Sequence, residues 1–190
     1  MSVSRGRILL VNGASSAGKT TLCRALQDQA DEPHLYLSPD TLLFTPGVLP
    51  KWNRFDAAYS WSSSRDRVFA GFFRSLAAFA EAGNGVIADI VLENEDQFAA
   101  LRSALSACDV LFVGLHCPLE VLQQREIARG DRRVGDAATD FAVVHTFSDY
   151  DVECDATQSP EENARFLLAT WQERLKINAQ GVLQKSGARQ

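Results

Sequence analysis

Eight residues near the start of the sequence carry its clearest chemistry. The run Gly13–Thr20 reads Gly-Ala-Ser-Ser-Ala-Gly-Lys-Thr and fits the phosphate-binding pattern G-x-x-x-x-G-K-[S/T] at each fixed position. Its glycines let the backbone approach a phosphate closely, so that successive N–H groups and a helix N-terminus can hold it. Lys19 would reach the β- and γ-phosphates, and Thr20 would offer its hydroxyl to Mg²⁺. The run predicts a site for ATP or GTP formed by Gly13, Ala14, Ser15, Ser16, Ala17, Gly18, Lys19, Thr20 and Thr21.

Two aspartates stand where expected strands end. Asp40 follows the short run His34–Leu37, and a carboxylate there can accept the proton of an attacking hydroxyl or aim that hydroxyl at the γ-phosphate. The alternative is that Asp40 caps a short helix over 41–44. Asp89 lies in the apolar run Val86–Val91, where a carboxylate is costly to bury without a partner. It is therefore either a contact for Mg²⁺ or substrate, or a structural hydrogen-bonding group.

A cluster of arginines stands out in an otherwise acidic chain: Arg125, Arg129, Arg132 and Arg133. Guanidinium groups match phosphate oxygens, and Gly130 would serve as a hinge, so we expect a lid over about 125–135. The alternative is an ordinary helix C-terminus, which also favours basic residues. In the lid, Arg125, Arg129 and Arg133 would bind the nucleotide, and Arg129 and Arg132 would act in catalysis together with Lys19 and Asp40.

An aromatic stretch over about 41–64 has no clear periodicity. Loops of this length are usually functional or disordered, and the aromatic content favours a folded acceptor pocket. The alternative is that the rings pack the loop onto the body of the protein. The aromatic residues in question are Trp52, Phe55, Tyr59 and Trp61.

The composition of the 190 residues is that of an ordinary globular domain, with 46% hydrophobic and 23% charged residues. The net charge of −5 argues against non-specific binding to nucleic acid or to anionic membranes. No apolar run approaches the roughly 20 residues of a membrane span, and the first residues show no cleavable signal. Four scattered cysteines indicate reduced thiols in a cytoplasmic protein: Cys23, Cys108, Cys117 and Cys154.

Alternating strands and helices must position these residues. We expect strands at 7–12, 34–37, 86–91, 110–115 and 150–154, and helices at 20–29, 63–81, 95–106, 118–129 and from 159 to about 178. Ser63 and Asp66 would form a capping box at the start of the second helix. The fold class is α/β, a P-loop kinase-like parallel five-stranded sheet flanked by helices on both faces. We expect one domain over 1–178 and a disordered tail over 179–190.

The order of these motifs resembles the chloramphenicol phosphotransferase family. Many kinases share the glycine loop, but the stretch from Arg125 to Asp155 is more specific: it contains Arg125-Glu-Ile-Ala-Arg-Gly-Asp-Arg132, Val143-Val-His145 and Tyr150-Asp-Val-Glu153. The resemblance covers about 7–171 and implies an ATP-dependent O-phosphotransferase with a kinase-like fold. It implies that Asp40 is the carboxylate that activates a primary hydroxyl of an antibiotic. It also matches Lys19 to the P-loop lysine and places Arg129 and Arg132 in a lid-like motif.

The sequence departs from the family pattern at two places. Residues 41–65 are fewer than in the chloramphenicol enzyme and carry different aromatic residues, so the acceptor is expected to differ. Asp89-Ile90 stands where the family has paired aspartates.

The sequence thus predicts a small-molecule kinase that uses ATP and Mg²⁺, with Thr20 and Asp89 at the metal and a hydroxyl compound as acceptor. Two alternatives stay open. One is a kinase of another metabolite, such as a nucleotide sugar or a sugar acid. The other is a nucleotide-binding regulatory module without an acceptor, whose ATPase activity would be indifferent to added hydroxyl compounds.

Overall fold

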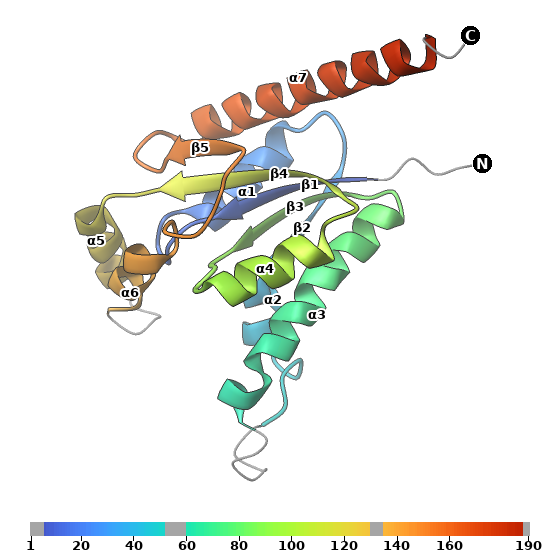
Figure 1. Ribbon diagram of the computed structural model, residues 1–190. Coiled ribbons are helices and arrows are strands. Elements are labelled where there is room, and N and C mark those ends of the chain that lie inside the picture. Colours follow the sequence, from blue (N-terminus) through green and yellow to red (C-terminus); the bar gives the residue numbers. More distant parts are fainter. Residues whose placement is uncertain (1–5, 52–59, 130–134, 188–190) are drawn as a thin grey trace.

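Five parallel strands form the centre of the molecule. The computed structural model describes residues 6–51, 60–129 and 135–187 (Figure 1). The strands are β1 (Arg7–Asn12), β2 (His34–Leu37), β3 (Gly85–Ile90), β4 (Asp109–His116) and β5 (Val152–Asp155). They lie in the order β2-β3-β1-β4-β5, and each neighbouring pair is parallel. The predicted five-stranded parallel sheet is confirmed.

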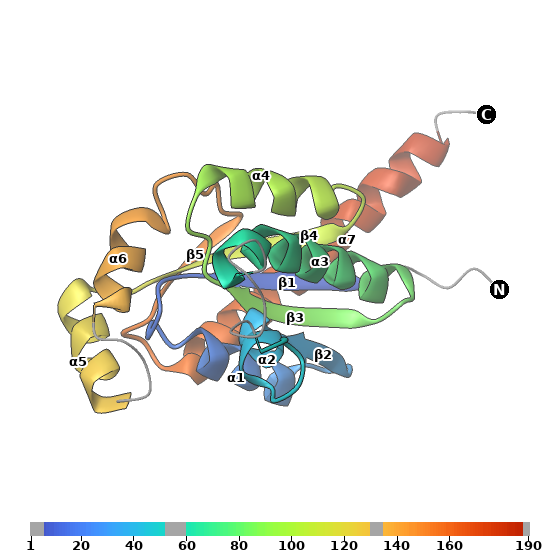
Figure 2. The ribbon, with the colours of Figure 1, turned by 90° about the horizontal axis from the view of Figure 1, so that it is seen from below.

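Helices cover both faces of this sheet (Figures 1 and 2). They are α1 (Lys19–Gln29), α2 (Pro39–Phe44), α3 (Trp61–Glu81), α4 (Glu95–Ala104), α5 (Leu119–Arg129), α6 (Asp136–Val143) and α7 (Pro160–Gly187). Leu9 and Val11 of β1 pack in one core with α1 and α7. Ile8 and Leu10 point the other way, into a second core with α3 and α4. This two-sided burial explains why β1 is apolar at consecutive positions.

The helices differ from the sequence predictions most at three places. Helix α3 begins at Trp61, two residues early, because Ser60 caps it and forms the capping box with Ser63; the box predicted from Ser63 to Asp66 was wrong. Helix α6 was not expected at all. Helix α7 continues to Gly187 and so runs past residue 178, where we expected the domain to end.

No helix in the described part of the chain is both long and apolar enough to cross a lipid bilayer. The sequence had led to the same expectation, since its apolar runs are short.

Candidate active site

A cleft of about 870 Å³ opens at the carboxyl ends of β1 and β3. The loop between β1 and α1 forms one wall, α2 and the start of α3 form another, and α5 and α6 contribute the rest. Ligands of parallel α/β sheets bind at this edge. The cleft brings together most of the described residues that the sequence singled out.

The glycine loop has the backbone that its pattern predicts, for two different reasons. Gly18 has φ 99°, a left-handed conformation that strains residues with a Cβ. Gly13 is needed for packing instead, since a Cβ there would lie 2.7 Å from the carbonyl oxygen of Leu115 in β4. Glycine at 13 therefore lets the loop approach β4. The sequence had instead suggested that this glycine allows a phosphate to approach the backbone.

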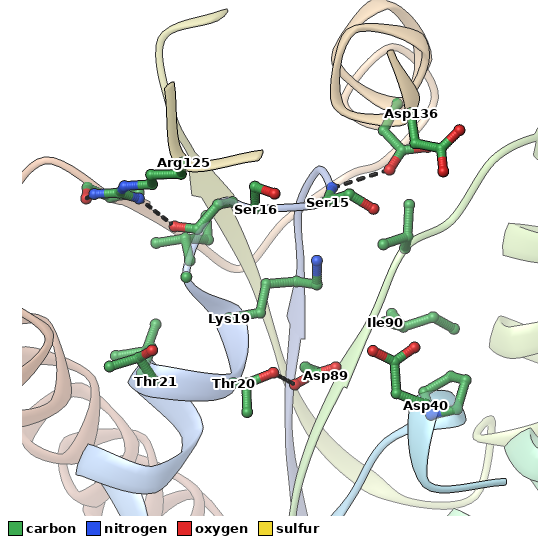
Figure 3. Close-up of a pocket in the computed structure, with 18 of the residues that line it drawn as sticks. Ser15, Ser16, Lys19, Thr20, Thr21, Asp40, Asp89, Ile90, Arg125 and Asp136 are labelled. Carbon is green, nitrogen blue, oxygen red and sulfur yellow. Dashed lines mark hydrogen bonds between the residues drawn. The ribbon is translucent and has the colours of Figure 1, made fainter. Parts of the chain in front are cut away.

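Lys19 is held at the floor of the cleft. Its side chain is nearly buried, with 9% of the residue exposed, and its Nζ donates a 2.9 Å hydrogen bond to the carbonyl oxygen of Ala14. Figure 3 shows this ammonium in the space that the carboxylate of Asp40 also enters. The loop thus places a positive charge in the cleft.

Three hydroxyl groups surround the carboxylate of Asp89, which is only 5% exposed. Thr20 Oγ1 and Tyr36 Oη donate to Asp89 Oδ2 at 3.2 and 2.6 Å, and Ser38 Oγ donates to Oδ1 at 3.1 Å. Burial, and then the charge of Asp89, raise the pKa of Tyr36, so its hydroxyl stays a donor. Asp89 therefore makes the hydrogen bonds expected of a structural group, and it also lines the cleft, as expected of a contact for Mg²⁺ or substrate.

The donor atoms here fit a magnesium ion. Mg²⁺ takes hard oxygen ligands and is usually held by one or two protein groups together with phosphate and water. Asp89 and Thr20 supply a carboxylate and a hydroxyl beside the glycine loop. The Thr20 hydroxyl has lone pairs left for a cation while it donates to Asp89.

Asp40 lies in the first turn of α2 and lines the cleft. The cap of this helix is Ser38, whose Oγ accepts a 3.2 Å hydrogen bond from the N–H of Asp40, so the alternative in which Asp40 is the cap was wrong. Strand β3 lies between β2 and β1, and Asp40 therefore faces the glycine loop across the end of β3 rather than from a neighbouring strand.

The described arginines divide into two roles. Arg125 donates from Nη1 to the carbonyl oxygen of Ala17 at 2.9 Å and from Nη2 to that of Ala156 at 3.0 Å. It therefore ties the glycine loop to the segment after β5, beside the cleft. Arg129 is exposed at the end of α5 and also lines the cleft. Arg132 and Arg133, and with them residues 130–134 of the expected lid, lie outside the described residues.

Helix α6 brings acidic groups to the glycine loop, which sequence reasoning missed. Asp136 and Asp140 line the cleft, and Asp140 Oδ2 accepts a 2.9 Å hydrogen bond from the N–H of Ser15. The buried Glu126 of α5 fixes the start of α6 by accepting from the N–H groups of Gly135 and Ala137, which lower its pKa. A carboxylate thus accepts a hydrogen bond from one N–H group of the glycine loop, which we had expected basic residues to cover.

A partly buried polar network surrounds Asn12, the residue before the glycine loop. Asn12, the last residue of β1, accepts from the N–H of Leu92 at 3.0 Å and donates to Tyr150 Oη at 2.8 Å. Tyr150 Oη lies 2.7 Å from Nδ1 of His145, whose ring stacks on His116 at 3.9 Å between centroids. Burial, and then His116, lower the pKa of His145 to about 4. The network joins the end of β1 to the segment that follows α6.

Apolar side chains, most of them aromatic, line the part of the cleft formed by α2 and α3. Leu43, Phe44, Trp61 and Phe69 line it, together with an ion pair between Arg65 and Glu93. Trp61 therefore lines the cleft, and its role in an acceptor pocket stays a prediction. The other three aromatic residues considered for that pocket, Trp52, Phe55 and Tyr59, lie outside the described residues.

Comparison with solved structures identifies the fold as that of P-loop kinases. The APS kinase of Mycobacterium tuberculosis, solved in complex with AMPPNP and APS, superposes with a TM-score of 0.67 at 16% identity, covering 88% of this chain and 98% of that one. A gluconokinase from Sinorhizobium meliloti 1021 gives a TM-score of 0.61 at 20% identity, covering 92% and 98%.

Sequence comparison is more specific. A Mycobacterium tuberculosis protein provisionally named an O-phosphotransferase is 31% identical over 186 residues, which cover 88% of this chain and 83% of the relative. The profile of the family described as chloramphenicol phosphotransferase-like protein matches residues 6–172, which include the glycine loop and the whole cleft. The chain therefore belongs to the chloramphenicol phosphotransferase-like family.

Proposed function

We propose that the protein is a cytoplasmic ATP-dependent O-phosphotransferase that transfers the γ-phosphate to a hydroxyl group of a small molecule. The observation that carries this proposal is the placement of Lys19 and Asp40 in one cleft, on opposite sides of the space above β3. A group that neutralises phosphate and a group that accepts a proton are the two parts that such a transfer needs.

The nucleotide would occupy the glycine loop. Its backbone N–H groups and Lys19 would hold the phosphates, with Asp140 displaced from the N–H of Ser15 or moved along with it. Arg129 would cover the phosphates from α5, and Arg132 and Arg133 remain proposed parts of the same lid. Mg²⁺, held by Thr20 and Asp89, would supply charge neutralisation at the phosphates. The AMPPNP named in the related kinase structure supports ATP as the donor.

Asp40 would aim the acceptor. Its carboxylate takes the proton of the acceptor hydroxyl while that oxygen bonds to the γ-phosphorus, and the bond from this phosphorus to the β,γ-bridging oxygen breaks to release ADP. Lys19 stabilises the charge that moves onto the leaving phosphate. Electrostatic stabilisation and positioning account for most catalysis in this reaction class.

The acceptor side favours a ring-bearing or partly apolar alcohol, because Leu43, Phe44 and Trp61 line it. Family membership makes an antibiotic hydroxyl the first candidate, with inactivation of the drug as the consequence. A sugar acid is the second candidate, since a gluconokinase shares the fold.

A screen of hydroxyl compounds tests the proposal. Purified protein with ATP and Mg²⁺ is incubated with amphenicols, other hydroxylated antibiotics, sugar acids and nucleotide sugars, and products are sought by mass spectrometry at an added 80 Da, the mass of a phosphoryl group in place of a proton. We expect one class to give a phosphorylated product with equal ADP release. ATP hydrolysis that is indifferent to every added compound would instead support the regulatory-module alternative.

A further inference from the structure

The cleft has two halves: the glycine loop Gly13–Thr20 with Asp89 forms the nucleotide half, and α2 with the start of α3 forms the acceptor half. One hydroxyl group, that of Ser38, connects them. Ser38 Oγ donates to Asp89 Oδ1 at 3.1 Å and accepts from the N–H of Asp40 at 3.2 Å. The same atom therefore touches the carboxylate proposed for the metal and the backbone of the residue proposed to aim the acceptor. Ser38 is itself only 3% exposed.

The other oxygen of Asp89 is held by two hydroxyls, those of Tyr36 at 2.6 Å and Thr20 at 3.2 Å. A carboxylate offers about four lone-pair positions, so three hydrogen bonds leave one for a cation or a water. Hydrogen bonds to a charged group are roughly twice as strong as neutral ones. Tyr36 and Ser38 together therefore fix how Asp89 is turned.

The register of the sheet explains this arrangement. Strands β2 and β3 are parallel, and Leu37 pairs with Ala88, so the next residues along the two strands are Ser38 and Asp89. Tyr36 precedes by two and lies on the same side of the strand as Ser38. A movement of Asp89 at the end of β3 would therefore shift its hydrogen-bond partner Ser38, which is the N-cap of α2.

We propose that Ser38 and Tyr36 are positioning residues of the transfer site, with Ser38 coupling the orientation of Asp89 to the helix that carries Asp40 and Tyr36 fixing the other oxygen of Asp89. The inference rests on the proposed function. When the Mg²⁺–nucleotide complex engages Asp89, α2 becomes more rigid and Asp40 is held at its working position. Without the Ser38 hydroxyl, the nucleotide still binds beside the glycine loop, but α2 does not become more rigid.

The first measurement is calorimetric and needs no acceptor. AMPPNP is titrated into the protein with and without Mg²⁺. Groups that orient a metal ligand typically contribute 10- to 100-fold to metal affinity. We expect Tyr36→Phe and Ser38→Ala each to weaken AMPPNP binding roughly tenfold with Mg²⁺ and to leave it unchanged without Mg²⁺. Equal Mg²⁺ dependence in both variants and the unaltered protein would overturn the assignment.

The second measurement separates the two residues. Amide hydrogen exchange over 40–44, the residues of α2 that follow Pro39, is measured as Mg²⁺ and AMPPNP are added. We expect added protection of α2 in the unaltered protein, in Tyr36→Phe and in Ser38→Thr, which keeps the hydroxyl. Ser38→Ala should show none. Protection of α2 in Ser38→Ala, or its loss in Ser38→Thr, contradicts the coupling.

Ser38→Gly distinguishes coupling from helix capping. Glycine serves as the N-cap of a helix almost as well as serine, whereas alanine does not. If Ser38 only caps α2, the glycine variant behaves like the unaltered protein and the inference fails. If the hydroxyl couples Asp89 to α2, glycine and alanine lose the response alike. An unaltered protein that binds AMPPNP with Mg²⁺ and phosphorylates no acceptor would instead refute the proposed function, and the coupling would still be measurable.

Discussion

The two halves of the cleft are built in opposite ways. The half that we propose binds the nucleotide, the loop Gly13–Thr20, continues β1 into α1 and is packed against the sheet: Ala14 and Ala17 are almost fully buried. The half that we propose binds the acceptor is formed by α2, in which Pro39 is the only buried residue, and by the start of α3. Phe44 is 68% exposed, in contrast to the 9% of Lys19.

This difference separates reaction from specificity. Positions tied into the core keep one geometry, because any change there disturbs the packing of the sheet. Exposed positions on a short helix can change with little effect on folding, so this is where a family can alter its acceptor. Substitutions in the nucleotide half should abolish transfer to every acceptor, whereas those in the acceptor half should act through the acceptor alone.

The largest expected effect comes from Lys19→Ala. Removing the ammonium leaves the charge of the phosphates unopposed at the floor of the cleft, and loss of one such stabilising group lowers kcat about 10²- to 10³-fold. The measurement is initial phosphorylation rate with the best acceptor of the screen, with circular dichroism to verify folding.

Arg24→Ala is the matched control for this prediction, since Arg24 is exposed on the same helix. It should retain full activity. If Lys19→Ala kept its rate for all acceptors, the nucleotide half would lose its central role.

Asp40→Asn should lower kcat about 10²-fold or more, the usual contribution of a positioned general base. Asparagine keeps the shape and the N–H bonded to Ser38, so AMPPNP affinity should not change. Rate and calorimetry together test both statements. Asp66→Asn, on the exposed side of α3, serves as the control. Near-normal turnover of Asp40→Asn would show that Asp40 does not accept the proton.

The nucleotide half could be predicted because its information is local. A pattern of eight consecutive residues identifies the loop Gly13–Thr20, and the apolar run before it identifies β1. Asp40 and Asp89 could also be placed at the correct sheet edge, because parallel strands end on the same side.

The partners of Asp89 could not be predicted, because they depend on strand order. Tyr36 and Ser38 reach it only because β2 neighbours β3 in this register. Asp140 was missed for a related reason: the start of α6 is fixed by Glu126 from α5, a contact between side chain and backbone that leaves no periodic signal in the sequence. The arginines of 125–133 form a basic pattern in the sequence, whereas no pattern connects the acidic residues after them to the glycine loop.

Phe44→Ala should raise the acceptor KM roughly tenfold, since burying part of an aromatic ring against a ligand contributes about 1–2 kcal/mol. The KM for ATP and the free energy of unfolding should change little, because substitutions of exposed residues usually cost under about 0.5 kcal/mol. Steady-state kinetics and chemical denaturation measure the two effects. Phe166→Ala, at a phenylalanine that is 52% exposed on α7, is the matched control and should alter neither. A higher KM for ATP in Phe44→Ala would merge the two halves.

The smallest expected effect concerns His145, which lies beneath the nucleotide half. Its pKa is about 4 in the folded protein, below the value near 6.5 of an unfolded chain. Between these values the unfolded chain binds a proton that the folded one does not, so acid lowers the free energy of unfolding as pH falls from about 6.5 to 4 and adds nothing further below that. The half-buried ring limits the change to about 1 kcal/mol.

His145→Gln removes this titration, so the stability advantage of the unaltered protein over the variant, measured by urea denaturation, should shrink as pH falls. Because Tyr150 and Asn12 connect His145 to the end of β1, AMPPNP affinity should weaken over the same pH interval in the unaltered protein. A stability difference that is constant from pH 7 to pH 4 would show that the folded protein does not exclude this proton.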